Sequence, residues 1–215
     1  MARFNPKPSI IVTVSPRPKM SNKHSFTRSI LCTLVWICLS ITPEWGVHPQ
    51  YATVFTTRLI FVSLFSAISF KFAPGLLEAL ISTTPPGLDF FKNLPTTTQK
   101  VWAIYALLLE KHDEKPLIYI GSGTSAEYGV QARLGQYHRG EKLARLVRAA
   151  LADGYSITHI GLLCIAPRPP SIFVGCMRLM FLALEATLTF FFKANCRPRK
   201  GDPDVTQLCP WETVP

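Results

Sequence analysis

One carboxylate stands in a setting that demands a chemical explanation. Glu185 lies in residues 172–192, an apolar run in which Arg178 is the only other charged residue. The two are seven positions apart, so a helix places them on the same face. An ionised carboxylate among apolar side chains costs free energy unless it is paired or holds a ligand. We therefore expect a special role for Glu185, and a single carboxylate suits Mg²⁺, which keeps several of its waters.

Two tyrosines and an arginine have the chemistry to complete a site for phosphodiester hydrolysis. Such a reaction needs an activated water and neutralisation of the charge that develops on the phosphate. Arg133 offers a planar, permanently charged guanidinium for phosphate oxygens. A tyrosine hydroxyl, whose pKa is ordinarily about 10, accepts a proton only if a nearby cation lowers that pKa. Tyr105 or Tyr119 could be this base, with the other orienting it, and the sequence leaves the choice open.

The pattern of apolar residues predicts the elements that would bring these side chains together. The apolar runs 101–109 and 117–120, joined by the charged turn 110–116, predict two strands of a hairpin. Helical spacing follows in residues 130–137 and 141–154, residues 157–166 predict a third strand, and 171–193 a long helix. The order β-β-α-α-β-α predicts an α+β domain over residues 100–196. We expect a small three-stranded antiparallel or mixed sheet flanked by helices.

The two predicted strands of the hairpin carry a paired motif. Residues 103–105 read Ala-Ile-Tyr and residues 119–121 read Tyr-Ile-Gly, which resembles the paired signature of the GIY-YIG nuclease superfamily. Arg133 with Tyr137 one turn later, then Glu185 on the last helix and Asn195 after it, follow in the order of that family. The segment after the second motif also resembles an uncharacterised fungal branch. The first motif departs from the family by beginning with Ala103 instead of glycine.

The resemblance implies a metal-dependent endonuclease that hydrolyses phosphodiester bonds in DNA, structured or branched DNA included. The catalytic residues would be Tyr105, Tyr119, Arg133, Tyr137 and Asn195, and Glu185 would hold Mg²⁺ or another divalent cation. No small-molecule cofactor is expected, because the GSG at 121–123 completes neither a GxGxxG nor a GK[ST] motif. Further residues are expected to contact nucleic acid: Gly121, His138, Lys142, Arg145, Arg148 and Arg178.

The rest of the chain adds charge and candidate targeting signals. Lys+Arg 23 against Asp+Glu 13 gives a net charge of +10, which favours an anionic partner. Residues 1–43 contain no acid, and we interpret them as a basic disordered or targeting segment that favours the mitochondrion or the nucleus. Residues 44–99 are predicted to hold an apolar, helical segment and a Thr/Pro-rich linker at 83–99. Residues 197–215 are predicted to be a C-terminal tail.

Two alternatives to an endonuclease stay open. One is a membrane-anchored protein, since residues 172–192 are long enough to span a bilayer and residues 30–72 offer a further apolar contact. Against it, the two charges within 172–192 would cost about 2.5–3.5 kcal/mol each on insertion scales. The other alternative is a GIY-YIG-like fold that binds nucleic acid without cutting it.

Overall fold

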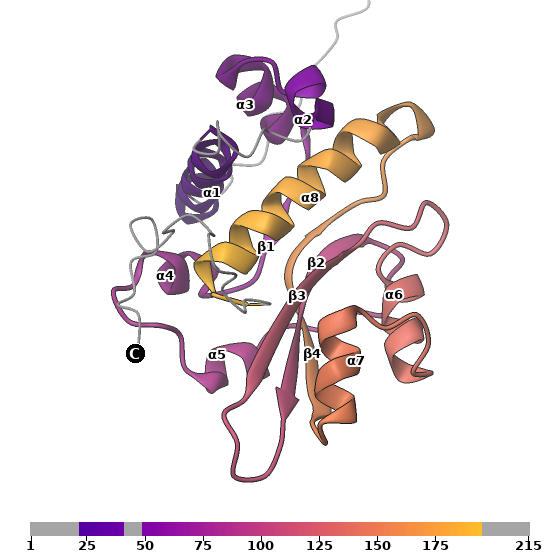
Figure 1. Cartoon of the computed structure of the whole chain (residues 1–215). Helices are drawn as coiled ribbons and strands as arrows, with labels where there is room; N and C mark the ends of the chain where they lie inside the picture. The colour runs from indigo at the N-terminus through magenta and orange to yellow at the C-terminus, as the bar shows by residue number, and fades with distance from the viewer. Residues whose placement is uncertain (1–21, 41–48, 195–215) are drawn as a thin grey trace, which may run out of the picture.

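A computed structural model describes residues 22–40 and 49–194, in which one antiparallel sheet is covered by helices on both faces (Figure 1). Its strands are β1 (Lys71–Phe72), β2 (Trp102–Glu110), β3 (Leu117–Gly123) and β4 (Ser156–Ala166). They lie in the order β1-β4-β2-β3. The predicted α+β class is confirmed. The expected tail at 197–215 and Asn195 lie outside the described residues, as does most of the basic segment 1–43.

The predicted number of strands is wrong by one, because β1 joins the sheet from the segment before residue 100. The residues of β1 were expected to belong to the apolar, helical segment, but the preceding helix α3 (Arg58–Ala67) ends before them. Phe72 pairs with Cys164 in register, and the N–H of Ala73 donates to the carbonyl of Leu163 at 2.9 Å. A strand of two residues is too short to show the alternation by which strands are found in a sequence.

The central strand β2 is buried on both of its faces. All residues from Trp102 to Leu109 are buried. Even-numbered residues such as Ile104 pack into one core, and odd-numbered residues such as Leu107 pack into another. Helices α6 (Gln131–His138) and α7 (Arg145–Ala152) cover the odd face. On the even face lies α8 (Val174–Phe191), which follows a short 3₁₀ turn at Ser171–Phe173.

Helix α8 packs against the sheet and against the N-terminal helices. It contacts β2, β3 and α1 (Asn22–Ser40). The Phe181 ring lies 5.6 Å from the Trp102 ring and 5.5 Å from the Phe70 ring, so it joins three segments of the chain. The same core includes residues of α3 and of α4 (Leu76–Ile81), and α2 (Pro49–Val54) contacts α8. By length and composition alone α8 could also cross a membrane.

The segment 83–99, expected to be a linker, contains a short helix and packs on the sheet. Helix α5 (Leu88–Lys92) buries Phe91, whose ring lies 5.6 Å from that of Phe192. Leu94 is also buried, and the carbonyl of Pro95 accepts a hydrogen bond from the N–H of Leu162 at 2.8 Å. A few apolar side chains within a Thr/Pro-rich stretch are enough to hold it against β4. The domain boundary at residue 100 stays a prediction.

We predict that Phe181→Ala lowers the free energy of unfolding by about 3–5 kcal/mol, the usual cost of removing a buried phenylalanine. Leu182→Ala is the matched control: its side chain is 40% exposed on the same helix, so the change should stay within about 0.5 kcal/mol. Urea unfolding of the full chain measures both. Equal losses for the two variants would contradict this account of α8.

Candidate active site

The two helical layers meet at the free edge of β3, the last strand of the sheet, which pairs only with β2 among the described residues. Arg133 and Tyr137 come from α6 on one face, and Glu185 comes from α8 on the other. They act on one another through space: the charge of Arg133 lowers the pKa of both Tyr119 and Glu185 against the effect of burial. The edge therefore gathers side chains from both layers.

Three tyrosines form the floor of this site. The hydroxyls of Tyr105 and Tyr137 lie 3.1 Å apart, and their rings meet edge to face with centroids 5.8 Å apart. Tyr105 is 1% exposed, and burial together with Tyr137 raises its pKa far above the ordinary value. Tyr119 is only half-buried; burial, then the nearby Tyr137 and Glu185, raises its pKa to about 12. The two signature tyrosines thus differ in their access to solvent.

The Arg133 guanidinium is held beside these hydroxyls. It lies over the Tyr137 ring, 5.1 Å from the centroid. Its Nη1 donates to the Gln136 side chain at 2.6 Å and to the carbonyl of Lys142 at 2.8 Å. A hydrogen bond with Arg133 acts to lower the pKa of Tyr105, although burial outweighs it. Arg133 as a whole is half-exposed.

Glu185 is half-buried beside β3 and is only partly compensated. Burial raises the pKa of its carboxyl, while hydrogen bonds from the Ser122 hydroxyl and backbone N–H, followed by the charge of Arg133, lower it. No cluster of three or more His, Cys, Asp or Glu side chains occurs in the described part of the chain. The residues fit Mg²⁺ in one way only: a single carboxylate ligand, with water completing the shell.

Sequence reasoning missed Ser122. Its position directly after Gly121 could have predicted the face on which it lies, because successive residues of a strand face opposite sides of the sheet. Since Tyr119 and Gly121 share the face of α6, Ser122 must face α8, where Glu185 lies. A serine at the edge of a sheet, opposite a lone glutamate on the covering helix, is therefore its natural donor.

Gly121 is required by the tyrosine opposite it. In the register of the hairpin it pairs with Tyr105. A Cβ on Gly121 would stand 2.6 Å from the Tyr105 hydroxyl oxygen and 3.0 Å from the Tyr119 ring. The missing side chain lets the Tyr105 ring cross over β3 toward Tyr137. The glycine of the second motif is thus explained by packing alone.

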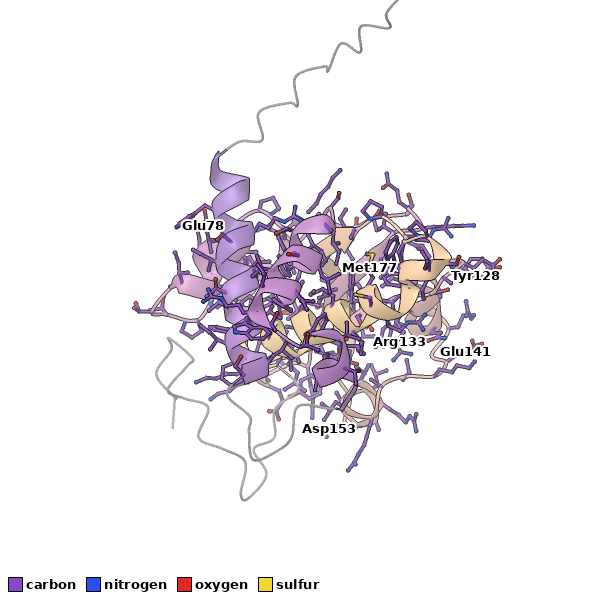
Figure 2. All side chains as sticks on the ribbon, turned by 90° about the horizontal axis from the view of Figure 1, so that it is seen from above. Glu78, Tyr128, Arg133, Glu141, Asp153 and Met177 are labelled. Atoms are coloured by element: carbon purple, nitrogen blue, oxygen red, sulfur yellow. The ribbon has the colours of Figure 1, made fainter. Side chains whose placement is uncertain are left out.

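The five basic residues that were predicted to contact nucleic acid are all exposed, and two of them, Arg148 and Arg178, also donate to backbone carbonyls. His138, Lys142, Arg145 and Arg148 are exposed, near Arg133 in the chain. Viewed from above, Arg133 and Glu141 lie on the side of the molecule away from Glu78 (Figure 2). Arg178 is exposed but donates to the carbonyl of Thr124 at 3.2 Å.

The loop 124–129, between β3 and α6, is tied down at several carbonyls. The Trp102 indole donates to Ser125 at 2.9 Å, and Arg168 donates to Ala126 at 3.0 Å and to Glu127 at 2.7 Å. Arg178 supplies the tie at Thr124. Gly129 at its end has φ +58°, and a Cβ there would overlap the carbonyl of Val101. The start of α6, which carries Arg133, is therefore held by the hydrogen bonds to this loop and by the close packing of Gly129 against Val101.

The side chains of Glu185, Arg133 and Tyr119 at the edge of β3 differ in charge and shift one another's pKa. A carboxylate, a guanidinium and a half-exposed phenol occupy one region of the surface, and each perturbs the ionisation of another.

No protein-family model, curated protein or solved structure matches the chain. The argument for a function consequently rests on these groups and on the resemblance carried by residues 103–105 and 119–121.

We predict that Glu185→Gln stabilises the protein at neutral pH. Because burial raises the pKa of Glu185, folding disfavours its charged form, so wild-type stability falls as pH rises through the ordinary and then the raised pKa. Melting temperatures of the two proteins should be close at pH 4 and diverge by pH 7. Added Mg²⁺ should raise the wild-type value only. Exposed Glu114→Gln is the control; a Glu185→Gln variant less stable than wild type at pH 7 would contradict us.

We also predict that Gly121→Ala destabilises the fold by about 1–3 kcal/mol, the range for overpacking a well-packed site. The new methyl group collides with the Tyr105 hydroxyl and ring. Gly175→Ala is the matched control, because nothing lies within 4 Å of a Cβ at that helical position. Chemical denaturation compares the two. Similar stability of both variants would show that Tyr105 can move aside.

Proposed function

We propose that the protein is an endonuclease that depends on a divalent metal ion and hydrolyses phosphodiester bonds in DNA. The observation that carries this proposal is the meeting of Glu185, Arg133 and Tyr119 at one exposed edge, from three different elements. A carboxylate kept in a costly position next to a guanidinium and a phenol suits a reaction on an anion. The likeness of residues 103–105 and 119–121 to the GIY-YIG signature supports the same function.

Arg133 is proposed to bind the scissile phosphate. Its guanidinium is anchored on one side by Gln136 and the carbonyl of Lys142, so its orientation is set before any substrate arrives. Preorganised donors are worth more than mobile ones, because they lose little freedom when the anion binds. The Tyr137 ring packs against the face of the guanidinium. Removing Arg133 should therefore weaken both binding and turnover.

Glu185 is proposed to hold the metal ion, with the Ser122 hydroxyl orienting its carboxylate. A bound Mg²⁺ would supply Lewis-acid neutralisation of charge at the phosphate and at the leaving oxygen. Glu185 must be ionised to bind a cation, and its pKa is raised by burial. Metal affinity should accordingly decline in mildly acidic solution, above the pH at which an ordinary glutamate becomes protonated.

Tyr119 is the better candidate for the base that takes a proton from the attacking water. It is half-exposed at the edge of the sheet, whereas Tyr105 is buried with its hydroxyl against that of Tyr137. Burial outweighs the charge of Arg133 and raises the pKa of Tyr119 to about 12, so Arg133 alone does not lower that pKa as the sequence led us to expect. A bound divalent cation would have to supply the further lowering, and activity should rise with pH through the alkaline range. Tyr105 and Tyr137 would then orient Arg133 and the water.

The exposed cations beside Arg133 are proposed to bind the DNA backbone. Lys142, Arg145 and Arg148 lie on the surface of α7 and the turn before it. Backbone contacts of this kind are independent of sequence and weaken steeply with salt. They would give affinity for nucleic acid without selecting a site of cleavage.

We predict that the full chain cuts plasmid DNA in the presence of Mg²⁺. Glu185→Gln should abolish cleavage while DNA binding persists, and Tyr119→Phe should slow it about 10²–10⁴-fold, the usual contribution of a general base. Glu114→Gln and Tyr128→Phe are the matched controls, because both side chains are exposed and neither has a role in the proposed chemistry. Cleavage rates and binding isotherms are measured on the same preparations.

Different outcomes would overturn different parts of this proposal. Equal cleavage by wild type and Glu185→Gln would remove the metal role of Glu185. A larger loss for Tyr105→Phe than for Tyr119→Phe would exchange the two tyrosines. Tight DNA binding with no cleavage on duplex, branched or single-stranded DNA would favour a nucleic-acid-binding protein instead of an enzyme.

A further inference from the structure

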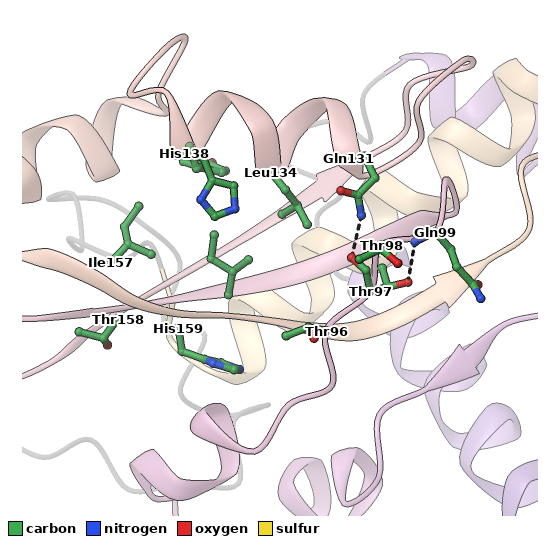
Figure 3. Close-up of a pocket in the computed structure, with 12 residues that line it drawn as sticks. Thr96, Thr97, Thr98, Gln99, Gln131, Leu134, His138, Ile157, Thr158 and His159 are labelled. Carbon is green, nitrogen blue, oxygen red and sulfur yellow. Dashed lines mark hydrogen bonds between the residues drawn. The ribbon is translucent and has the colours of Figure 1, made fainter.

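A pocket of about 960 Å³ opens on the face of the sheet covered by α6, between that helix, β4 and the segment 96–99 (Figure 3). Its walls are Thr96, Thr97, Thr98, Gln99, Gln131, Leu134, Tyr137, His138, Ile157, Thr158, His159 and Ile160. This volume lies at the upper end of the range of about 300–1,000 Å³ for sites that bind small molecules. None of the proposed roles of Glu185, Arg133 and Tyr119 uses it.

The lining of the pocket combines polar side chains with a few aliphatic ones. Its twelve residues include hydroxyls, amides and two imidazole rings, and no Lys, Arg, Asp or Glu. Leu134 on α6 and Ile157 and Ile160 on β4 supply apolar surface. No permanently charged side chain lines the pocket to hold a phosphate or an ammonium group. The lining instead suits a flat, neutral group that has apolar faces and hydrogen-bonding edges.

Several polar groups of the pocket have no partner in the described part of the chain. His138 is exposed and makes no hydrogen bond there, nor do the hydroxyls of Thr96 and Thr98. Figure 3 shows the His138 ring projecting from α6 toward β4. By contrast Gln131 is fixed, because its Nε2 donates to the carbonyl of Thr97 at 2.7 Å. The pocket thus has one side chain, Gln131, held by a hydrogen bond, and donors and acceptors on His138, Thr96 and Thr98 that a ligand could use.

The pocket adjoins the candidate active site through a shared side chain. Tyr137 lines the pocket, and its hydroxyl lies 3.1 Å from that of Tyr105. Arg133 and His138 lie on the same helix, with Arg133 beside the tyrosine hydroxyls and His138 in the pocket. A ligand bound to the guanidinium by a phosphate could therefore continue around α6 into the pocket.

We propose that this pocket receives the base of an unpaired nucleotide next to the phosphate held by Arg133. The inference rests on the proposed function and deepens it, because it makes nucleic acid with an unpaired base the preferred substrate. An unstacked base offers π-faces for the His138 ring and hydrogen-bonding edges for Thr and Gln side chains. A fully paired duplex keeps its bases stacked and would leave the pocket empty.

The test measures binding without cleavage. The full chain, in EDTA, is titrated with a short DNA duplex that carries one bulged 2-aminopurine, and with the same duplex fully paired; RNA versions form a second pair. We predict about tenfold tighter binding of the bulged duplex, the scale of stacking one base on a protein ring. The fluorescence of the 2-aminopurine should change on binding.

Two variants locate the preference. His138→Ala removes the exposed ring and Thr96→Val removes a hydroxyl. Each should reduce the ratio of the affinity for the bulged duplex to the affinity for the paired duplex several-fold. His112→Ala is the matched control, since its side chain is 93% exposed in the turn after β2. A preference lost in His138→Ala and kept in His112→Ala supports the proposal.

The outcomes separate this inference from the proposed nuclease. Equal affinity for bulged and paired duplexes, or an unchanged preference in His138→Ala, overturns the pocket inference even if the protein cleaves DNA. A preference for the bulge that depends on His138, without cleavage in Mg²⁺, supports the pocket and overturns the nuclease. A bulge preference confined to the RNA pair supports the pocket and changes the substrate to RNA.

Discussion

Burial of β2 on both faces is the constraint on which the rest of the structure depends. A strand with no solvent-facing side must be covered twice, so the chain supplies α6 and α7 to one face and α8 with the N-terminal helices to the other. The layers can then approach each other only around an edge of the sheet. At β3, that edge carries Tyr119, Gly121 and Ser122 within reach of both layers. The candidate site follows from the layering.

The electrostatics of the site are a compromise between burial and charge. Burial raises the pKa of the Glu185 carboxyl, while the hydrogen bonds from Ser122 and the charge of Arg133 oppose that rise. Full burial would leave a neutral acid, and full exposure would leave an ordinary surface glutamate that a cation scarcely distinguishes from others. Functional sites often hold such groups at intermediate burial, and stability is lost in return.

Local patterns in the sequence predicted the hairpin and the later helices, because periodicity depends on short stretches of chain, and the motifs named Tyr105, Tyr119, Arg133 and Glu185, whose roles stay a proposal. Strand β1 and helix α5 escaped prediction, because Phe72 and Phe91 acquire their structure from distant partners in β4 and at Phe192. Ser122 and the pocket were missed for a related reason. Each exists only where two elements far apart in the sequence come together, and no short window contains both.

Loop 124–129 lies between the second motif, which ends at Gly121, and Arg133 on α6, and it is held at its carbonyls. A free insert of this length would blur the position of the guanidinium and add conformational entropy that substrate would have to remove. Ties from Trp102, Arg168 and Arg178 remove that entropy during folding. The loop beside Arg133 therefore keeps less conformational entropy for substrate to remove than an untied loop would.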